Sequence, residues 1–407
     1  MNIEVITERE RLEPLRSEWD ALARADGRDG FFRTSSWYLT WLECIWPDAR
    51  PFVIAVRAAD GRLLGLAPLC RYRYSHLGFS LWAIGFGGRD VVSGDFLDFL
   101  SVPASRADVS NAILDVLWQQ RSLWSVLVFG EVLVGTDFHI ALESWSKRTG
   151  LEMRQQEERI CPYLVLPDSF EAYLQHLGSS TRYHIRRRTR ELLEKYKARI
   201  ELCSEPAAIR AGLCDLIRLH VTRWRNQNQL GTLAKPGFAR FLERVCLASP
   251  DNASARLYLL KDGDKAVAAM LAFHFGESAI YYQTGWDPDS PLTRSSPGVA
   301  LMAYSIQDAI RRHLRFYEFL RGGERYKFHW TGTYRKTITI LLARTALARG
   351  YLRIAGAKDL AKQLLQKANI LPGEQAPGVA NTAESGASRR VAPTPSEHNS
   401  THRPHLL

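Results

Sequence analysis

Two Asp-Gly turns, each between two apolar runs, do most to limit the folds open to this chain. Asp60-Gly61 separates PFVIAVRA from RLLGLAPLC, and Asp262-Gly263 separates ARLYLLK from KAVAAMLAF. An Asp-Gly pair between such runs is a strong signal of a β-hairpin. In both halves of the chain, helices precede the turn, and a strand, a Gly-containing loop, a helix and a further strand follow it. This order predicts an internal duplication.

Mixed helix and strand signals in each half predict an α/β protein with mixed sheets flanked by helices. The length of 407 residues suits two domains. We expect an N-terminal domain over residues 1–160, a C-terminal domain over 161–345 and a helix over 346–371. The stretch 372–407 is rich in Gly, Pro, Ser and Thr, so we expect it to be disordered.

Composition narrows the classes of partner and compartment. No run approaches the eighteen or so apolar residues of a transmembrane helix, and the N-terminal stretch does not read as a signal peptide. We therefore expect a cytoplasmic protein. The six cysteines form no CxxC pair and have no neighbouring His, so no metal site is expected. A net charge of +11 favours an anionic partner.

The stretch 292–332 combines a polar turn, an apolar helix, a strand and a polar loop. The first turn of a helix presents free backbone N–H groups, which bind phosphate readily. Arginine can grip a phosphate with two hydrogen bonds, and glycine permits close backbone approach. The residues predicted to hold a phosphate are Arg294, Ser295, Ser296 and Gly298. The alternative is an ordinary capped helix with proline in its first turn.

This order of hairpin, strand, anion-binding helix and strand resembles the GNAT (acyl-CoA N-acyltransferase) fold. More closely, the chain resembles the CelD/BcsL-type acetyltransferases, a tandem-domain group related to the FemAB-type transferases. Four segments carry the resemblance: FFRTSSWYLTWLECIWP, SGDFLDFL, YYQTGWDPDSPLTRSSPGVALMAYSIQDAI and YEFLRGGERYKFHWTG. The last departs from the family pattern DFLRGDEPYK at Glu318, Gly323 and Arg325. The resemblance extends over residues 1 to about 345.

The resemblance implies transfer of an acetyl or other acyl group from acetyl-CoA (acyl-CoA) to an amine or hydroxyl, in exopolysaccharide or cellulose biosynthesis. The acceptor would attack the thioester directly, Glu324 would remove its proton, and Tyr326 or Tyr304 would protonate the leaving thiolate. Glu324 could instead be a solvated residue paired with a neighbouring arginine. Either tyrosine could simply pack.

Three further residues are candidates for substrate binding. Asp95 and Asp98 lie among apolar residues, and their odd spacing places them on opposite faces of a regular strand. One of them could line an acceptor cleft between the domains, or both could protect an edge strand from aggregation. Lys327 could hold a phosphate of either substrate, or be a solvated loop residue.

Residues 179–199 form a predicted basic helix with eight Lys or Arg against two Glu. So many like charges suit an anionic ligand such as a polyphosphate donor, an acidic membrane or tRNA, although a solvated face is the alternative. An aminoacyl-tRNA-dependent, FemAB-like transferase is therefore the main rival, and a non-catalytic partner of a polysaccharide synthase is another. No RNA-binding motif is present, and no DNA partner is expected.

Overall fold

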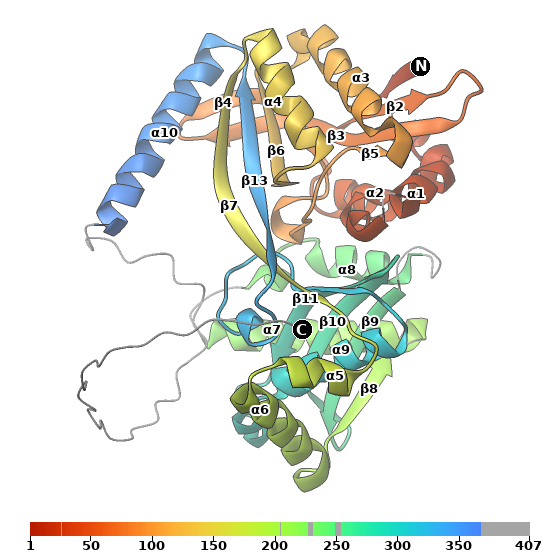
Figure 1. Ribbon diagram of the computed structural model, residues 1–407, viewed down its shortest axis with the longest axis vertical. Coiled ribbons are helices and arrows are strands. Elements are labelled where there is room, and N and C mark those ends of the chain that lie inside the picture. Colours follow the sequence, from red (N-terminus) through yellow and green to blue (C-terminus); the bar gives the residue numbers. More distant parts are fainter. Residues whose placement is uncertain (26, 204, 227–230, 249–253, 368–407) are drawn as a thin grey trace, which may run out of the picture.

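A computed structural model describes residues 1–25, 27–203, 205–226, 231–248 and 254–367. Within these residues the chain forms a mixed, thirteen-stranded sheet with helices on its faces (Figure 1). The strands are β1 Asn2–Ile6, β2 Arg50–Arg57, β3 Leu63–His76, β4 Phe79–Phe86, β5 Leu100–Ser101, β6 Val126–Leu133, β7 Glu152–Val165, β8 Arg199–Cys203, β9 Ser254–Asp262, β10 Lys265–Phe275, β11 Ser278–Trp286, β12 Phe316–Glu318 and β13 Tyr334–Ala343. The helices are α1 Arg16–Ala25, α2 Ser35–Cys44, α3 Arg106–Gln119, α4 Asp137–Thr149, α5 Phe170–His176, α6 Ser179–Arg190, α7 Pro206–Arg225, α8 Phe238–Leu247, α9 Pro297–Arg311 and α10 Ala346–Lys367.

The sheet has two parts, which we call the N-terminal and C-terminal lobes. Strand order in the first is β1-β2-β3-β4-β6-β13-β7, and in the second it is β7-β12-β11-β10-β9-β8. Strand β7 belongs to both: residues 152–162 pair with β13, and residues 163–165 pair with β12. Strand β7 is therefore much longer than the apolar stretch at its end, Tyr163–Val165. Its first half, EMRQQEERI, has too few apolar residues to signal a strand on its own.

Both predicted hairpins are confirmed, and the two lobes repeat one plan. Strands β2 and β3 pair across Asp60-Gly61, and β9 and β10 pair across Asp262-Gly263. In each lobe, the strand that comes directly after the hairpin pairs in parallel with the strand that follows the next helix. These pairs are β4 with β6 and β11 with β12. The fold class predicted from the sequence, α/β with mixed sheets flanked by helices, is confirmed.

The end of the described chain returns to the N-terminal lobe. Strand β13 lies between β6 and β7, and α10 packs beside it, where Tyr351 and Tyr74 share a hydrogen bond of 2.9 Å. The predicted C-terminal domain, 161–345, thus includes a strand that completes the sheet of the other lobe. The domain limits stay a prediction about folding units. Residues 368–407, including the predicted tail, lie outside the described residues.

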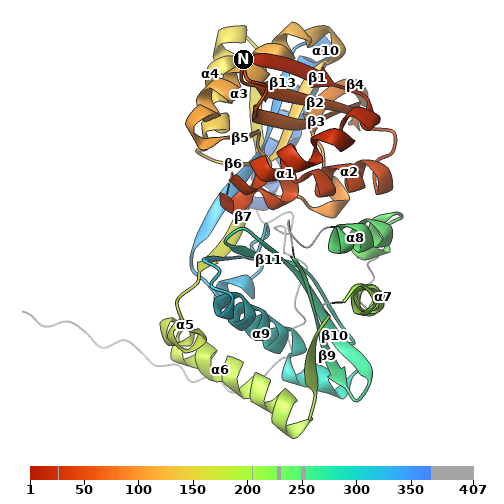
Figure 2. The ribbon, with the colours of Figure 1, turned by 90° about the vertical axis from the view of Figure 1, so that its right-hand side faces the viewer.

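Helices cover both faces of the C-terminal sheet (Figure 2). Helices α7 and α8 lie on one face, while α9 lies on the other with α6 against it. Residues 170–196 do not form one continuous helix, because the chain breaks at Leu177 and Gly178, between α5 and α6. The predicted basic helix over 179–199 also ends early: α6 continues as a π-helical turn, Glu191–Lys195, and Lys197 then adopts φ +55° before β8 begins. No described helix is both long and apolar enough to cross a bilayer.

Candidate active site

The defining feature of the site is a divergence between β11 and β12. The two strands pair only through Ser278–Ile280 and Phe316–Glu318. Beyond this point β11 continues along β10, whereas the chain after β12 follows β7: the N–H groups of Phe319 and Gly322 donate to the carbonyls of Pro162 and Ile160 at 3.0 and 2.9 Å. A wedge-shaped opening therefore separates β11 from the segment 319–327.

A cavity of about 240 Å³ occupies this opening. Strand β11, helix α7, the segment 319–327 and part of the loop before β5 line it. Four residues predicted from the sequence, Asp95, Glu324, Tyr326 and Lys327, are among those lining residues. The structure thus brings together two of the three candidate proton-transfer residues, all but Tyr304, and two of the three candidate substrate-binding residues, all but Asp98.

Lys327 fixes the loop that carries Glu324. Its buried ammonium donates to the carbonyls of Leu320 and Arg321 at 3.3 and 2.7 Å and lies 3.0 Å from Glu324 Oε2. These three partners match the three N–H donors of lysine. The alternative interpretation, a solvated loop residue, is wrong, because Lys327 is buried and its ammonium holds the chain's own oxygens. Binding of a substrate phosphate by Lys327 stays a prediction. Gly322 has φ +117°, and a Cβ there would lie 2.3 Å from the Glu324 carboxylate, so this turn requires glycine.

Tyr326 presents a protonated hydroxyl in the cavity. The hydroxyl lies 3.4 Å from that of Tyr281. Burial, reinforced by Tyr281 and Glu324, raises the pKa of Tyr326 well above its usual value of 10. The phenol therefore keeps its proton at neutral pH, as a general acid must. Tyr304, the other candidate, packs its ring against Tyr258, with ring centroids 5.8 Å apart.

Asp95 joins the two lobes at the wall of the cavity. The fully buried carboxylate accepts the backbone N–H of Arg321 at 2.8 Å, and the Arg321 guanidinium lies 3.1 Å from Asp95 Oδ1 and 2.5 Å from Glu131 Oε1. Burial raises the pKa of Glu131, while Arg321 opposes the shift. Since β6 supplies Glu131 and the segment after β12 supplies Arg321, this cluster anchors the lobes to each other.

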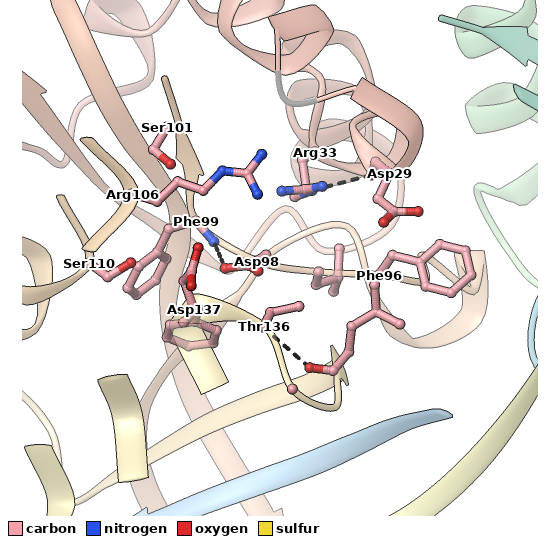
Figure 3. Close-up of a pocket in the computed structure, with 14 residues that line it drawn as sticks. Asp29, Arg33, Phe96, Asp98, Phe99, Ser101, Arg106, Ser110, Thr136 and Asp137 are labelled. Atoms are coloured by element: carbon pink, nitrogen blue, oxygen red, sulfur yellow. Dashed lines mark hydrogen bonds between the residues drawn. The ribbon is translucent and has the colours of Figure 1, made fainter. Parts of the chain in front are cut away.

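Asp98 faces a second pocket, of about 280 Å³, in the N-terminal lobe (Figure 3). Its carboxylate accepts the N–H of Phe99 at 2.6 Å, and the guanidinium groups of Arg33 and Arg106 point toward one another beside it. Asp95 and Asp98 thus line different pockets, as their odd spacing suggested. The segment is an irregular loop, however, with Phe96 at φ +56°.

The residues predicted to hold a phosphate lie at the start of α9. Ser296 is the residue before the helix, has φ +55°, and makes no side-chain cap. Arg294 is exposed, and a Cβ on Gly298 would meet no described atom within 4 Å. The helix therefore lacks the hydroxyl cap of the alternative interpretation. The space above Gly298 is open.

The basic helix lies beside this open helix end. Helix α6 packs on α9, and the turn that follows α6 contacts the turn that precedes α9. Although desolvation opposes the shift, hydrogen bonds from Ser295 and Arg188 lower the pKa of Glu191 in that turn. The residues predicted to hold a phosphate and the predicted basic helix thus lie side by side in the fold.

Helix α7 supplies lining residues that the sequence analysis missed. His220, Arg223 and Trp224 all reach the cavity. Trp224 Nε1 donates to His220 Nε2 at 2.9 Å, and burial lowers the pKa of His220 to about 4, so the ring is neutral. Gly285 of β11 allows this close packing, because a Cβ there would lie 2.5 Å from His220 N. The sequence does contain a signal for these residues: they stand at positions i, i+3 and i+4 and therefore share one face of the helix.

Comparison with known proteins agrees with this geometry. Residues 179–328 match the acetyltransferase (GNAT) domain. This segment runs from α6 to the loop with Glu324 and Tyr326, so it includes most of the cavity wall. No curated protein gives a significant match. The GNAT-like fold expected from the sequence is therefore present, whereas nothing confirms the finer CelD/BcsL assignment.

Solved structures resemble the whole two-lobed arrangement. FemX is 14% identical, with a TM-score of 0.58 over 84% of this chain and 98% of its own. A conserved protein of unknown function from Bacteroides thetaiotaomicron is 11% identical, with a TM-score of 0.53 over 84% of this chain and all of its own. A C-terminal domain assigned to a lysylphosphatidylglycerol synthetase of Agrobacterium fabrum is 11% identical, with a TM-score of 0.50 over 84% and 96%. At these identities the likeness concerns the fold alone.

Proposed function

We propose that the protein is an acyltransferase that moves an acyl group from acyl-CoA to an amine or hydroxyl acceptor. One observation carries the proposal: the cavity between β11 and the segment after β12 contains Glu324 and Tyr326, and the loop 287–296 connects β11 to the open end of α9. The GNAT domain match over the same residues supports acyl transfer.

The proposed reaction needs three groups in the cavity. Glu324 accepts the proton of the acceptor as its nitrogen or oxygen attacks the thioester carbonyl. The edge of β11 beyond Ile280, which has no strand partner on this side in the described chain, offers backbone N–H groups to the developing oxyanion. The carbon–sulfur bond then breaks, and Tyr326 donates its proton to the departing thiolate.

The donor would extend from the cavity to the start of α9. Its pyrophosphate would bind the N–H groups of the first helical turn together with Arg294 and Ser296, close to the backbone of Gly298. Ser295 is buried and its hydroxyl already bonds to Glu191, so its part in this proposal is to shape the turn. The neighbouring basic helix adds positive potential to this region. In this proposal Lys327 acts on the substrate only indirectly, by holding Glu324 in place.

The basic helix is also the observation that favours the rival donor, aminoacyl-tRNA. A tRNA would contact many cations at once, and its binding would weaken steeply with salt. The saccharide acceptor and the exopolysaccharide role stay predictions that rest on the sequence resemblance.

A thermal shift titration separates these donors. We expect acetyl-CoA or another acyl-CoA to stabilise the protein by about 2.7 kcal/mol at a hundredfold excess over Kd. We expect the Arg294→Ala variant to need more ligand for the same shift, and the Glu10→Gln variant, changed at an exposed residue far from the site, to behave as the parent. No shift with any acyl-CoA, together with transfer from aminoacyl-tRNA, would replace the proposal by its rival.

A further inference from the structure

Arg223 holds a fixed cationic group at the wall of the cavity. Its guanidinium carbon lies 3.6 Å from the ring centroid of Trp286 and 5.5 Å from that of Trp224. A guanidinium stacked on indole gains cation–π attraction and loses rotational freedom. The side chain is thus positioned before any substrate arrives.

Arg321 and Arg335 are also half-buried, but unlike them Arg223 has no anionic partner within 4 Å in the described chain. Arg321 lies against Asp95 and Glu131, and Arg335 lies 2.8 Å from Asp29. No carboxylate of a described residue lies within 4 Å of Arg223, and among these residues no acceptor binds its buried Nε. A partly desolvated cation without a counter-ion is unfavourable, so a ligand that supplies the negative charge would bind well.

Glu324 faces the same cavity, within electrostatic range of Arg223. The cavity therefore offers a carboxylate and a guanidinium that are not paired with each other. Desolvation lowers the pKa of Arg223, while Tyr281, Tyr326 and Glu324 oppose this shift. An arginine side chain stays charged at neutral pH. Because Lys327 already lies 3.0 Å from Glu324, the charge that lacks a partner is that of Arg223. A small molecule with both an amine and an acid group would supply that partner while its nitrogen faces Glu324.

We propose that Arg223 binds an anionic group, a carboxylate or a phosphate, on an amine acceptor whose nitrogen lies at Glu324. This inference rests on the proposed function, because it assigns the substrate class of the same cavity. It makes Arg223 a specificity residue: the guanidinium forms two hydrogen bonds to the acid group and orients the nitrogen toward the acyl carbon.

Matched acceptor pairs test this assignment. The probes are glycine with glycinamide, and glucosamine 6-phosphate with glucosamine, each assayed with acetyl-CoA. The first pair reports a carboxylate and the second a phosphate. The variants are Arg223→Gln, Arg223→Lys and the control Arg225→Gln, which removes the same charge from an exposed position in the same helix.

We expect Arg223→Gln to raise the KM of the preferred anionic probe roughly tenfold to a hundredfold. The KM of its neutral counterpart and of acetyl-CoA should change less than about twofold, because neither contacts the guanidinium. The KM of the anionic probe in Arg223→Lys should lie between the values of the parent and of Arg223→Gln. In Arg225→Gln it should equal that of the parent. Equal losses for the anionic and neutral probes would overturn the inference, since they would indicate a role in oxyanion stabilisation or folding.

Calorimetric titration of the same four probes separates this inference from the proposed function. If the parent transfers no acyl group to any acceptor, the proposed function fails. Tighter binding of an anionic probe than of its neutral counterpart, lost in Arg223→Gln, would still support the assignment of Arg223. Equal affinity of the parent for both members of each pair would overturn it.

Discussion

Each lobe contains a short pair of parallel strands that then diverge, and the two lobes differ in what fills the opening between the strands. In the N-terminal lobe, β4 and β6 pair through Ala83–Gly85 and Val126–Val128 and then diverge. In the C-terminal lobe, β11 and β12 pair over an equally short stretch and then diverge. Both lobes therefore share one backbone arrangement. They differ in what lies between the diverging strands.

The chain itself fills the N-terminal opening. The loop between β4 and β5 hydrogen-bonds to the strands on both sides, with Gly87 N donating to Pro68 O and Leu97 N to Glu131 O, both at 3.0 Å. The rings of Phe99 and Phe138 pack with centroids 4.3 Å apart. In the C-terminal lobe the loop that follows β11, residues 287–296, supplies none of the residues that line the cavity, and the segment after β12 runs along β7. The opening there therefore stays hollow.

Because of this difference, the N-terminal lobe supports the cavity of the C-terminal lobe. The loop that fills the N-terminal opening presents Asp95 to the C-terminal cavity, where the carboxylate binds Arg321. A duplicated fold can thus keep one binding cleft and use the second copy as its wall. The comparison yields four predictions, given from the largest effect to the smallest.

Replacing Glu324 with Gln tests whether the hollow opening performs chemistry. We expect kcat to fall roughly a hundredfold to ten-thousandfold, because the amide cannot accept the proton. Initial rates with acetyl-CoA and the best acceptor measure the loss. The Glu10→Gln variant should retain full activity. A change of less than about threefold in Glu324→Gln would mean that the cavity has another base.

Replacing Asp95 with Ala tests whether the loop between β4 and β5 stabilises the C-terminal lobe at its cavity. We expect a loss of about 2–3 kcal/mol in the free energy of unfolding, because Arg321 loses a buried partner and keeps only Glu131. Urea denaturation measures this loss. An unchanged midpoint would show that the lobes do not depend on this contact.

Replacing Tyr326 with Phe tests the proton donor. We expect kcat to fall about tenfold to a hundredfold, since water can supply the proton less efficiently. The raised pKa of Tyr326 keeps the phenol protonated below pH 10, so the parent should lose no activity from this group as the pH rises from 7 to 9. The same pH profile in parent and Phe variant, with equal kcat, would exclude the role.

Replacing Asp98 with Asn should have the smallest effect. Its carboxylate faces the pocket of the N-terminal lobe and not the cavity with Glu324. We expect kcat and KM with any acceptor to stay within about twofold of the parent. A larger loss would show that both pockets take part in one reaction, and the contrast between the lobes would have to be abandoned.

Local patterns were enough to predict some of this arrangement. The Asp-Gly turns predicted both hairpins, and the polar segment around Glu324 and Tyr326 predicted two residues that do share a cavity. The role of Lys327 was not predictable, because its partners include the carbonyls of Leu320 and Arg321, which no sequence pattern marks.

Long-range pairing accounts for what the sequence could not predict. Strand β13 joins the N-terminal sheet from the far end of the chain, and the charged first half of β7 is a strand only because β13 pairs with it. No role was assigned to Arg223 from the sequence. Its position became informative only when α7 was seen to lie against Trp286.

The central claim is that the open start of α9 binds the diphosphate of an acyl-CoA. Calorimetric titration of acetyl-CoA into the Gly298→Glu variant tests it most directly. A glutamate in the first helical turn favours the helix, and a Cβ at this position meets no described atom, so the free energy of unfolding should stay equal or rise by up to about 1 kcal/mol. The negative charge should nevertheless weaken acetyl-CoA binding at least tenfold. An unchanged affinity in a variant of equal stability would contradict the claim.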